Sequence, residues 1–171
     1  MRTLVTYLSL TGNTRKVAEA IYEELPGSKD LKELDQVEDL DGYDLTFIGF
    51  PIHSSGQPDL AAVDFLRQKA VGQHVAIFVT HAASEDFPLI SEWMESCRQA
   101  ADRTKLLGSF NCQGALSEQQ LTVMRSSPDP KVREWAERAI HSAGQPDASR
   151  LEKAKAFVRE VLDKYDTLSL R

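Results

Sequence analysis

The chain has 171 residues, of which 42% are hydrophobic and 27% are charged, and its formal net charge is −6. This size and composition favour one domain with a well-buried core, and the acidic surplus disfavours a nucleic-acid-binding surface, which would need clustered Lys and Arg. No apolar run approaches the roughly 20 residues that span a bilayer, and the first residues lack the basic and apolar regions of a signal peptide, so we expect a cytoplasmic protein that does not enter a membrane.

The first predicted strand, 4–8, is followed by a turn rich in hydroxyl groups, and a helical period begins at Arg15. A turn between a strand and a helix leaves unpaired backbone N–H groups at the positive end of the helix dipole, where a phosphate binds readily. Gly12 allows a close approach of the anion or a positive φ. An ordinary capped strand-to-helix turn is the alternative. The turn consists of Ser9, Leu10, Thr11, Gly12, Asn13 and Thr14.

The turn contains no cationic side chain. It lacks the lysine of the nucleoside-triphosphate loop and the three glycines of the dinucleotide fingerprint. Neutral donors of this kind suit a phosphate monoester that is held by hydrogen bonds without a metal. They argue against phosphoryl transfer, which needs magnesium and a charge clamp.

The hexapeptide S-L-T-G-N-T, placed directly after the first strand, resembles the phosphate-binding loop of the flavodoxin family, whose pattern is roughly S/T-x-T-G-x-T. The resemblance implies that this loop holds the phosphate of FMN. It also implies a flavodoxin-like, doubly wound α/β fold. In that fold a five-stranded parallel sheet with strand order 2-1-3-4-5 has helices on both faces.

Short apolar runs alternate with helical periods along the chain, which predicts repeated β-α units and a parallel sheet covered on both faces. After the first strand we expect a helix over 15–25, ended by Pro26-Gly27, and a polar edge strand over 28–36. Helices are also expected from Leu60 to Leu66 and over 90–101. The remaining strands are predicted at 43–50, 74–80 and 106–112.

Three loops, 9–14, 51–58 and 81–88, follow strands of the predicted sheet. In a parallel sheet such loops lie side by side at the carboxyl edge, and the ligand crevice of a doubly wound sheet lies where the strand order reverses. The three loops are therefore expected to surround one site.

The resemblance implies that the second and third of these loops enclose the isoalloxazine ring of FMN. Neither loop has the Trp or Tyr with which many flavodoxins stack on the ring. In the family, a glycine peptide after the third strand turns its carbonyl toward the reduced flavin, and Ser55-Gly56 is the candidate here. The cofactor-binding residues predicted in this part of the site are Pro51, Ile52, His53, Ser54, Ser55, Gly56, Thr80, His81, Ala82, Ala83 and Phe87.

Few side chains suggest chemistry independent of a flavin. His53 and His81 have a reference pKa near 6.5 and are candidates for proton transfer, although loop histidines more commonly are solvated or form local hydrogen bonds. Cys97 and Cys112 lack metal-ligand spacing, so we expect small buried side chains there. The sequence assigns no catalytic residue and no metal site.

Residues 115–148 depart from the short flavodoxin pattern, while 1–114 and a final helix over 149–165 follow it. A Pro128-Asp129-Pro130 break separates two predicted helices, 118–125 and 131–141. We expect them to pack beside the site because Trp135 and several alanines suggest burial. The alternatives for residues 115–148 are a mobile loop and a surface that docks a partner protein. Residues 1–171 are thus predicted to form a single flavodoxin-like domain with an inserted helical segment.

The function indicated by the resemblance is FMN-dependent electron transfer between redox partner proteins. A reductase of the same fold, which oxidises NAD(P)H and reduces a quinone or a flavin, is the enzymatic alternative. A relative that has lost its flavin and acts as a binding module is the third. Fold alone does not distinguish them; the lack of a second nucleotide fingerprint favours the carrier, and the phosphate loop argues against the flavin-free relative.

Overall fold

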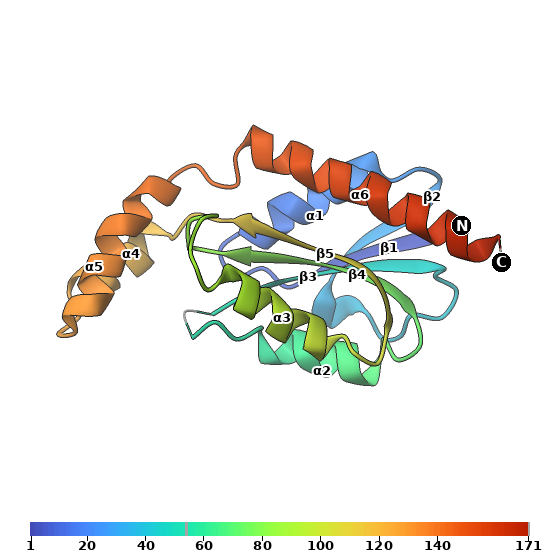
Figure 1. The fold of residues 1–171 in the computed structure, drawn as a ribbon, viewed down its shortest axis with the longest axis horizontal. Coiled ribbons are helices and arrows are strands. Elements are labelled where there is room, and N and C mark those ends of the chain that lie inside the picture. Colours follow the sequence, from blue (N-terminus) through green and yellow to red (C-terminus); the bar gives the residue numbers. More distant parts are fainter. Residues whose placement is uncertain (54, 171) are drawn as a thin grey trace.

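A computed structural model describes residues 1–53 and 55–170 and has a five-stranded parallel sheet at its centre (Figure 1). The strand order is β2-β1-β3-β4-β5, which confirms the predicted topology. All five strands run in the same direction, so the loops that follow them leave from one edge. The strands are β1 (Arg2–Tyr7), β2 (Ser28–Glu33), β3 (Leu45–Pro51), β4 (His74–His81) and β5 (Lys105–Gln113).

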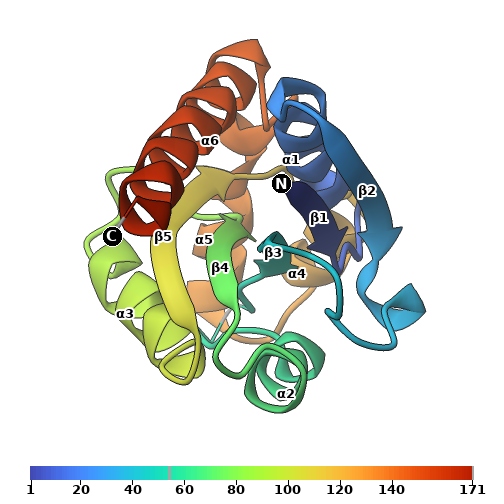
Figure 2. The same cartoon turned by 90° about the vertical axis from the view of Figure 1, so that its right-hand side faces the viewer.

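The helices form two layers, one on each face of the sheet, as Figure 2 shows end-on. Helices α1 and α6 pack on one face around Phe47 and Phe78, and α2 and α3 cover the other around Ile48 and Phe50. The predicted doubly wound α/β fold is therefore confirmed. No helix formed by the described residues is long and apolar enough to cross a membrane. The helices are α1 (Asn13–Glu24), α2 (Leu60–Gln68), α3 (Ile90–Ala100), α4 (Glu118–Arg125), α5 (Pro130–Ala139) and α6 (Ala148–Ser169).

The edge strand β2 is shorter than predicted. It is polar and half-solvated, as an edge strand can be, but the predicted range 28–36 is wrong at its end, where residues Leu34–Gln36 form the 3-10 helix η1. The side chain of Gln36 accepts a hydrogen bond from the backbone N–H of Glu33, and Leu34 turns into the core. Capping and burial together turn the chain out of the sheet.

Other boundaries differ from the prediction by a few residues. Helix α1 starts at Asn13, so two residues of the hydroxyl-rich turn belong to its first turn. Strand β3 starts only at Leu45, because Tyr43 donates its backbone N–H to Leu40 in a turn. Helix α5 ends at Ala139 and is followed by the 3-10 helix η2 (Ile140–Ser142), and α6 extends to Ser169.

Helices α4 and α5 stand beyond the carboxyl edge of the sheet, away from the two helical layers (Figure 1). We call residues 115–147, which contain them, the cap. Its own apolar cluster consists of Leu121, Ala136 and Ala139, with Leu116 and Met124 packed against it. The cap is joined to the rest of the chain by the end of β5 on one side and by α6 on the other. It therefore covers the edge at which all the strand-to-helix loops emerge.

Candidate functional site

A cavity of about 480 Å³ lies between the carboxyl edge of the sheet and the cap. Its size is within the range of small-molecule sites, roughly 300–1,000 Å³. The residues that line it are Leu10, Thr11, Asn13, Thr14, Pro51, Ile52, His53, Thr80, His81, Ala82, Trp93, Gly114, Ala115, Leu116, Gln119, Gln120, Val123, Met124 and Trp135.

The three predicted loops contribute unequally to this cavity. Predicted site residues that line it are Leu10, Thr11, Asn13, Thr14, Pro51, Ile52, His53, Thr80, His81 and Ala82. Predicted residues outside the lining are Ser9, Gly12, Ser55, Gly56, Ala83 and Phe87. Ser54 lies outside the described residues. The structure thus brings the ends of β1, β3 and β4 together, whereas the binding of a cofactor by these residues stays a prediction.

The first loop presents several backbone donors at the start of α1. The Ser9 hydroxyl oxygen accepts hydrogen bonds from the N–H groups of Gly12 (3.1 Å) and Arg15 (3.2 Å), and Gly12 has φ +89°. Because the helix dipole is positive here, unpaired N–H groups at this point attract an anion. Among the described residues, no acceptor pairs with the backbone N–H groups of Leu10, Thr11, Asn13 and Thr14.

Four side chains of this loop already have partners within the protein, since the Thr11 hydroxyl oxygen also accepts a hydrogen bond from Nδ2 of Asn13 (3.1 Å). Asn13 donates from Nδ2 to the carbonyl of Ala115 (2.7 Å), so its amide links the loop to the cap. The buried hydroxyls of Thr14 and Thr80 lie 2.8 Å apart. One of them donates to the other, which leaves a single hydrogen for a ligand. Among the described residues, the unpaired donors of the loop are therefore the backbone N–H groups of Leu10, Thr11, Asn13 and Thr14 and the hydroxyl hydrogens of Ser9 and Thr11.

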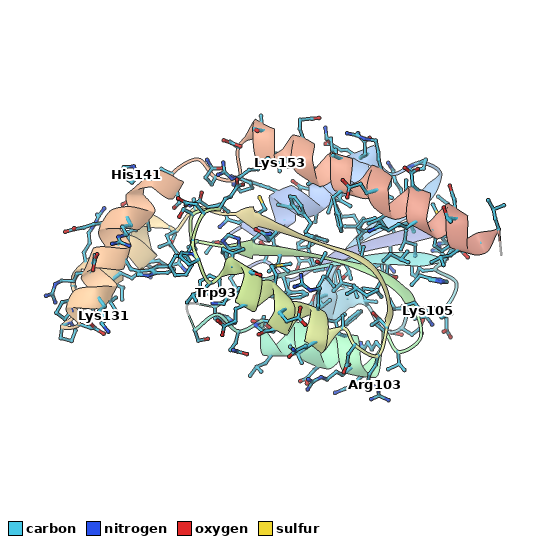
Figure 3. The ribbon with its side chains drawn as sticks, in the orientation of Figure 1. Trp93, Arg103, Lys105, Lys131, His141 and Lys153 are labelled. Atoms are coloured by element: carbon cyan, nitrogen blue, oxygen red, sulfur yellow. The ribbon has the colours of Figure 1, made fainter. Side chains whose placement is uncertain are left out.

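Aromatic side chains from helices, not from the loops, form a wall of the cavity. Trp93 of α3 and Trp135 of α5 both line it, and Figure 3 shows Trp93 on the end of α3 nearest the cap. Phe87, predicted to contact the flavin ring, instead packs between the two indoles, with ring centroids 5.2 Å from Trp93 and 5.9 Å from Trp135. The predicted loops contain no Trp or Tyr, but Trp93 and Trp135 from the helices give the site an aromatic wall.

Gly56 and Gly114 occupy positions at which a side chain would collide with this site. A Cβ at Gly56 would overlap the indole of Trp93, and the residue has φ +77°. A Cβ at Gly114 would lie 2.6 Å from Cγ of Asn13. Close packing thus requires glycine at both positions, and at Gly56 it brings the loop after β3 against the aromatic wall.

The two histidines that line the cavity have different surroundings. His81, the last residue of β4 and not a loop residue as predicted, is buried, with Nδ1 3.0 Å from the carbonyl of Ala83 and Nε2 3.1 Å from Oδ1 of Asn111. Burial lowers the pKa of His81. Both partner atoms are acceptors as placed, and a neutral imidazole has a single N–H, so a neutral ring bonds to both partners only with the Asn111 amide turned to present its NH₂ group. His53 is half-exposed and lies 2.9 Å from a carboxylate oxygen of Asp59.

The described lining contains no Asp, Glu, Lys or Arg. Within the described part of the chain, no three His, Cys, Asp or Glu residues are grouped to hold a metal ion. Cys97 and Cys112 are free and buried, and burial raises the pKa of each thiol to about 12. The cavity thus suits a ligand bound by neutral donors and apolar contact, with its one anionic group at the start of α1.

The sequence predicts helices beside the site, with Trp135 as a sign of burial, but it does not identify which of their residues line the cavity, nor Trp93. A helical period on α4 was the available signal, because Gln119 and Val123 are one turn apart and share a face. Which way that face points depends on how the cap docks, and the periodicity does not contain that information. The lining residues that were missed are Trp93, Gly114, Ala115, Leu116, Gln119, Gln120, Val123, Met124 and Trp135.

Comparisons with known proteins agree with this geometry. Residues 4–159 match the family model described as a flavodoxin domain. The chain is 29% identical, over 174 aligned residues, to the flavodoxin-like domain-containing protein BilS of Clostridioides difficile (strain CD3), and the alignment covers 96% of this chain and 98% of that protein.

Solved structures with a similar fold include two bacterial flavoproteins. A flavoprotein from Lactobacillus acidophilus NCFM, crystallised in complex with FMN, is 26% identical with a TM-score of 0.53, over 64% of this chain and 92% of its own. Oxidised flavodoxin 1 from Bacillus cereus has a TM-score of 0.57 over 95% of this chain and 98% of its own. Its identity is 13%, so this likeness concerns the fold alone.

Proposed function

The chain belongs to the flavodoxin domain family, and from this we propose that it binds FMN at the carboxyl edge of its sheet and transfers electrons between redox partner proteins in the cytoplasm. The observation that carries the proposal is the set of backbone N–H groups at the start of α1 that pair with no described residue and that open onto a cavity with an aromatic wall and no charged side chain in its described lining. The similarity of this chain to a flavoprotein crystallised with FMN supports the choice of cofactor.

The described residues fit both ends of this cofactor. The phosphate would be held by the backbone N–H groups of the first loop and by the Thr11 hydroxyl, since a helix N-terminus suits a phosphate group. The ring would contact Ile52, Ala82 and Trp93, which offer apolar and aromatic surface. When bound, FMN supplies the electron-transfer chemistry, and the protein contributes position and surroundings.

His81 acts in this proposal as a positioning residue. Its Nδ1 is held by the carbonyl of Ala83 and its ring packs edge-on against Trp93, with ring centroids 6.3 Å apart. A ring that is buried and bonded on both sides fixes the end of β4 beside the flavin. No proton-transfer step is assigned to it.

We also propose that residues 1–171 act as one flavodoxin-like domain, in which the cap is an addition to the site. The bond from Asn13 to the carbonyl of Ala115 and the contact of Phe87 with Trp135 support this, because they connect the start of α1 and the loop after β4 with the cap. The first of these bonds involves the proposed phosphate loop itself. Cap position and cofactor binding are therefore coupled in this proposal.

A charge substitution tests the site of the phosphate. Thr11 is exposed, so Thr11→Glu should fold, but its carboxylate would repel the phosphate, and we expect the FMN dissociation constant to rise about tenfold or more. Thr122→Glu places the same charge on an exposed residue of α4 outside the lining and should leave the affinity within about twofold. Flavin fluorescence titration measures both. Equal affinities of the two variants would place the phosphate elsewhere.

Reduction kinetics distinguish the carrier from its alternatives. We expect the FMN-loaded protein to accept electrons from a flavodoxin reductase and to show only slow turnover with NADPH and a quinone alone. The described lining, without Lys or Arg, supports this expectation, since a dinucleotide carries several phosphate charges. Rapid turnover without a partner protein would favour the reductase, and failure to bind FMN would favour the flavin-free relative.

A further inference from the structure

The start of α6 carries a positive charge at a position that the helix itself disfavours. Asp147 is the N-cap, and its side chain accepts the backbone N–H of Arg150 in the first turn. The helix dipole is positive at this end, so a cation here destabilises the helix. Arg150 is also the least exposed of the paired cations that the structure describes, with 18% of its side chain accessible. Its charge therefore depends on partners outside the helix.

Three side chains from different segments surround the guanidinium of Arg150. Its Nε lies 3.0 Å from a carboxylate oxygen of Glu85 in the loop after β4, and because this N–H is not aligned for a hydrogen bond, the contact is an ion pair. Nη1 donates to the carboxylate of Asp147 at 3.2 Å, and Nη2 donates to the side-chain oxygen of Gln113 at 3.3 Å. The planar guanidinium has five N–H donors in a fixed arrangement, so one side chain reaches all three partners.

The contact with Gln113 continues to the wall of the cavity. Gln113 is the buried last residue of β5, and its Nε2 donates to the carbonyl of Ala82 at 3.4 Å. Because Arg150 donates to the oxygen of this amide, its NH₂ group is turned toward Ala82. Ala82 lines the cavity and is one of the residues assigned above to the flavin ring. Arg150 thus acts on the site although it does not line it.

The contact with Glu85 holds the same loop at a second point. Lys153, labelled in Figure 3 and one turn further along α6, lies 3.2 Å from the other carboxylate oxygen of Glu85. Both oxygens are thus paired with cations of α6. In the described structure residues 82–89 form no helix or strand, so contacts of this kind, and not a backbone ladder, decide where the loop lies.

We infer that Arg150 is a positioning residue of the flavin site, which holds the loop after β4 beside the bound ring through Gln113 and Glu85. The inference deepens the proposed function and rests on it for the ring. Two competing roles are a tie that only stabilises the fold and a cation that acts on the ring by its charge alone.

Three variants of α6 separate these roles. Arg150→Gln removes the charge and the planar set of donors. Arg150→Lys keeps the charge, but a single ammonium group does not reproduce the three contacts. Arg159→Gln is the control, because it removes the same charge from the same helix at an exposed position that is paired with Glu24.

Hydrogen exchange of the FMN-free protein tests the position of the loop without the cofactor. Both Arg150 variants should exchange about tenfold or more faster than the parent over residues 82–86, whereas the control should stay within about twofold. Parent-like exchange of this loop in both variants would overturn the inference.

FMN binding and the visible circular dichroism of the bound flavin test the effect on the site. We expect both Arg150 variants to raise the FMN dissociation constant about fivefold and to alter the dichroism, with the control within about twofold of the parent. A tie that only stabilises the fold would lower the urea midpoint and leave the affinity and the dichroism unchanged. Rescue of both by Arg150→Lys would show that charge alone matters, and either result would overturn the inference.

A substitution on the loop keeps the test available if the Arg150 variants do not fold. Glu85 is exposed, and Glu85→Gln weakens its pairs with Arg150 and Lys153, so the FMN dissociation constant should rise about threefold. An unchanged constant would then contradict the inference. Failure of the parent itself to bind FMN contradicts the proposed function, whereas parent-like FMN binding by the variants contradicts the role of Arg150 alone.

Discussion

The two sides of the cavity are held in place by different amounts of structure. The strand side consists of the ends of three buried strands and the first turn of α1, tied together by the bond between Thr14 and Thr80. The cap is a pair of short helices with a small apolar cluster of its own. Local opening free energies follow the density of buried contacts. The strand side is therefore the fixed part of the site, and the cap is the part that can open.

The contacts that position the cap are few and can be named. Asn13 donates from its side-chain amide to the carbonyl of Ala115, and Trp135 packs against Phe87. A ligand that touches both sides would add contacts across this junction.

The largest effect is expected from a methyl group added to the strand side. A Cβ at Gly49 in β3 would overlap the buried ring of Phe78 in β4, so Gly49→Ala should reduce the free energy of unfolding by about 3 kcal/mol or more. Gly144 in the cap has open space around it, so a Cβ there meets no other atom. Gly144→Ala should therefore cost only the backbone strain of φ +81°, about 1–2 kcal/mol. Urea denaturation compares the two. Equal losses would contradict the contrast between the sides.

A second substitution tests whether the cap opens by itself. Leu121→Ala removes the largest buried side chain of the cap cluster and should lower its local stability by about 2–3 kcal/mol. Hydrogen exchange should speed up in α4 and α5 while the strands keep their protection. Leu66→Ala, on the fully buried face of α2, is the control and should speed up exchange throughout the chain. If Leu121→Ala also exposed the strands, the cap would unfold together with the sheet.

The strand side was predictable because its signals are local. An apolar run followed by Ser, Gly and Thr residues predicts a strand, a turn and a helix start, and the parallel topology then brings 9–14, 51–53 and 80–82 to one edge. Composition did not indicate where β2 ends, since that depends on the burial of Leu34.

The cap side was less predictable because its contacts are not local. The sequence predicts helix α4 correctly at 118–125, but not that Val123 lines the cavity or that Trp135 meets Phe87. Those contacts depend on the docking of elements far apart in the chain. For the same reason Asn13, expected as a phosphate donor, has its amide bonded to Ala115.

An intermediate effect on FMN binding and on stability is expected from replacing the threonines of the first loop. Thr11→Ala removes a hydroxyl whose oxygen accepts from Asn13 and whose hydrogen can donate to the phosphate, and it should weaken FMN binding by about 0.5–1.5 kcal/mol. Thr14→Ala should also destabilise the fold by about 1–3 kcal/mol, because it leaves the buried Thr80 hydroxyl unpaired. Thr122→Ala on α4 is the control for both. Undiminished FMN affinity in a Thr11→Ala, Thr14→Ala double variant would show that the phosphate is not bound here.

The smallest effect is expected at the boundary between the two sides, where His81 packs against Trp93. Burial lowers the pKa of His81 in the folded protein below its ordinary value near 6.5. The unfolded chain therefore binds the proton more readily, and the stability that the neutral ring contributes is present above about pH 6.5 and is lost as the pH falls through the folded-state pKa. His81→Gln, which cannot titrate, should lose less stability than the parent between pH 7 and pH 5 in urea denaturation. The carboxylates with lowered pKa values, such as Asp30 and Asp147, titrate below this window and are present in both proteins. If the two proteins lost equal stability, folding would not lower the pKa of His81.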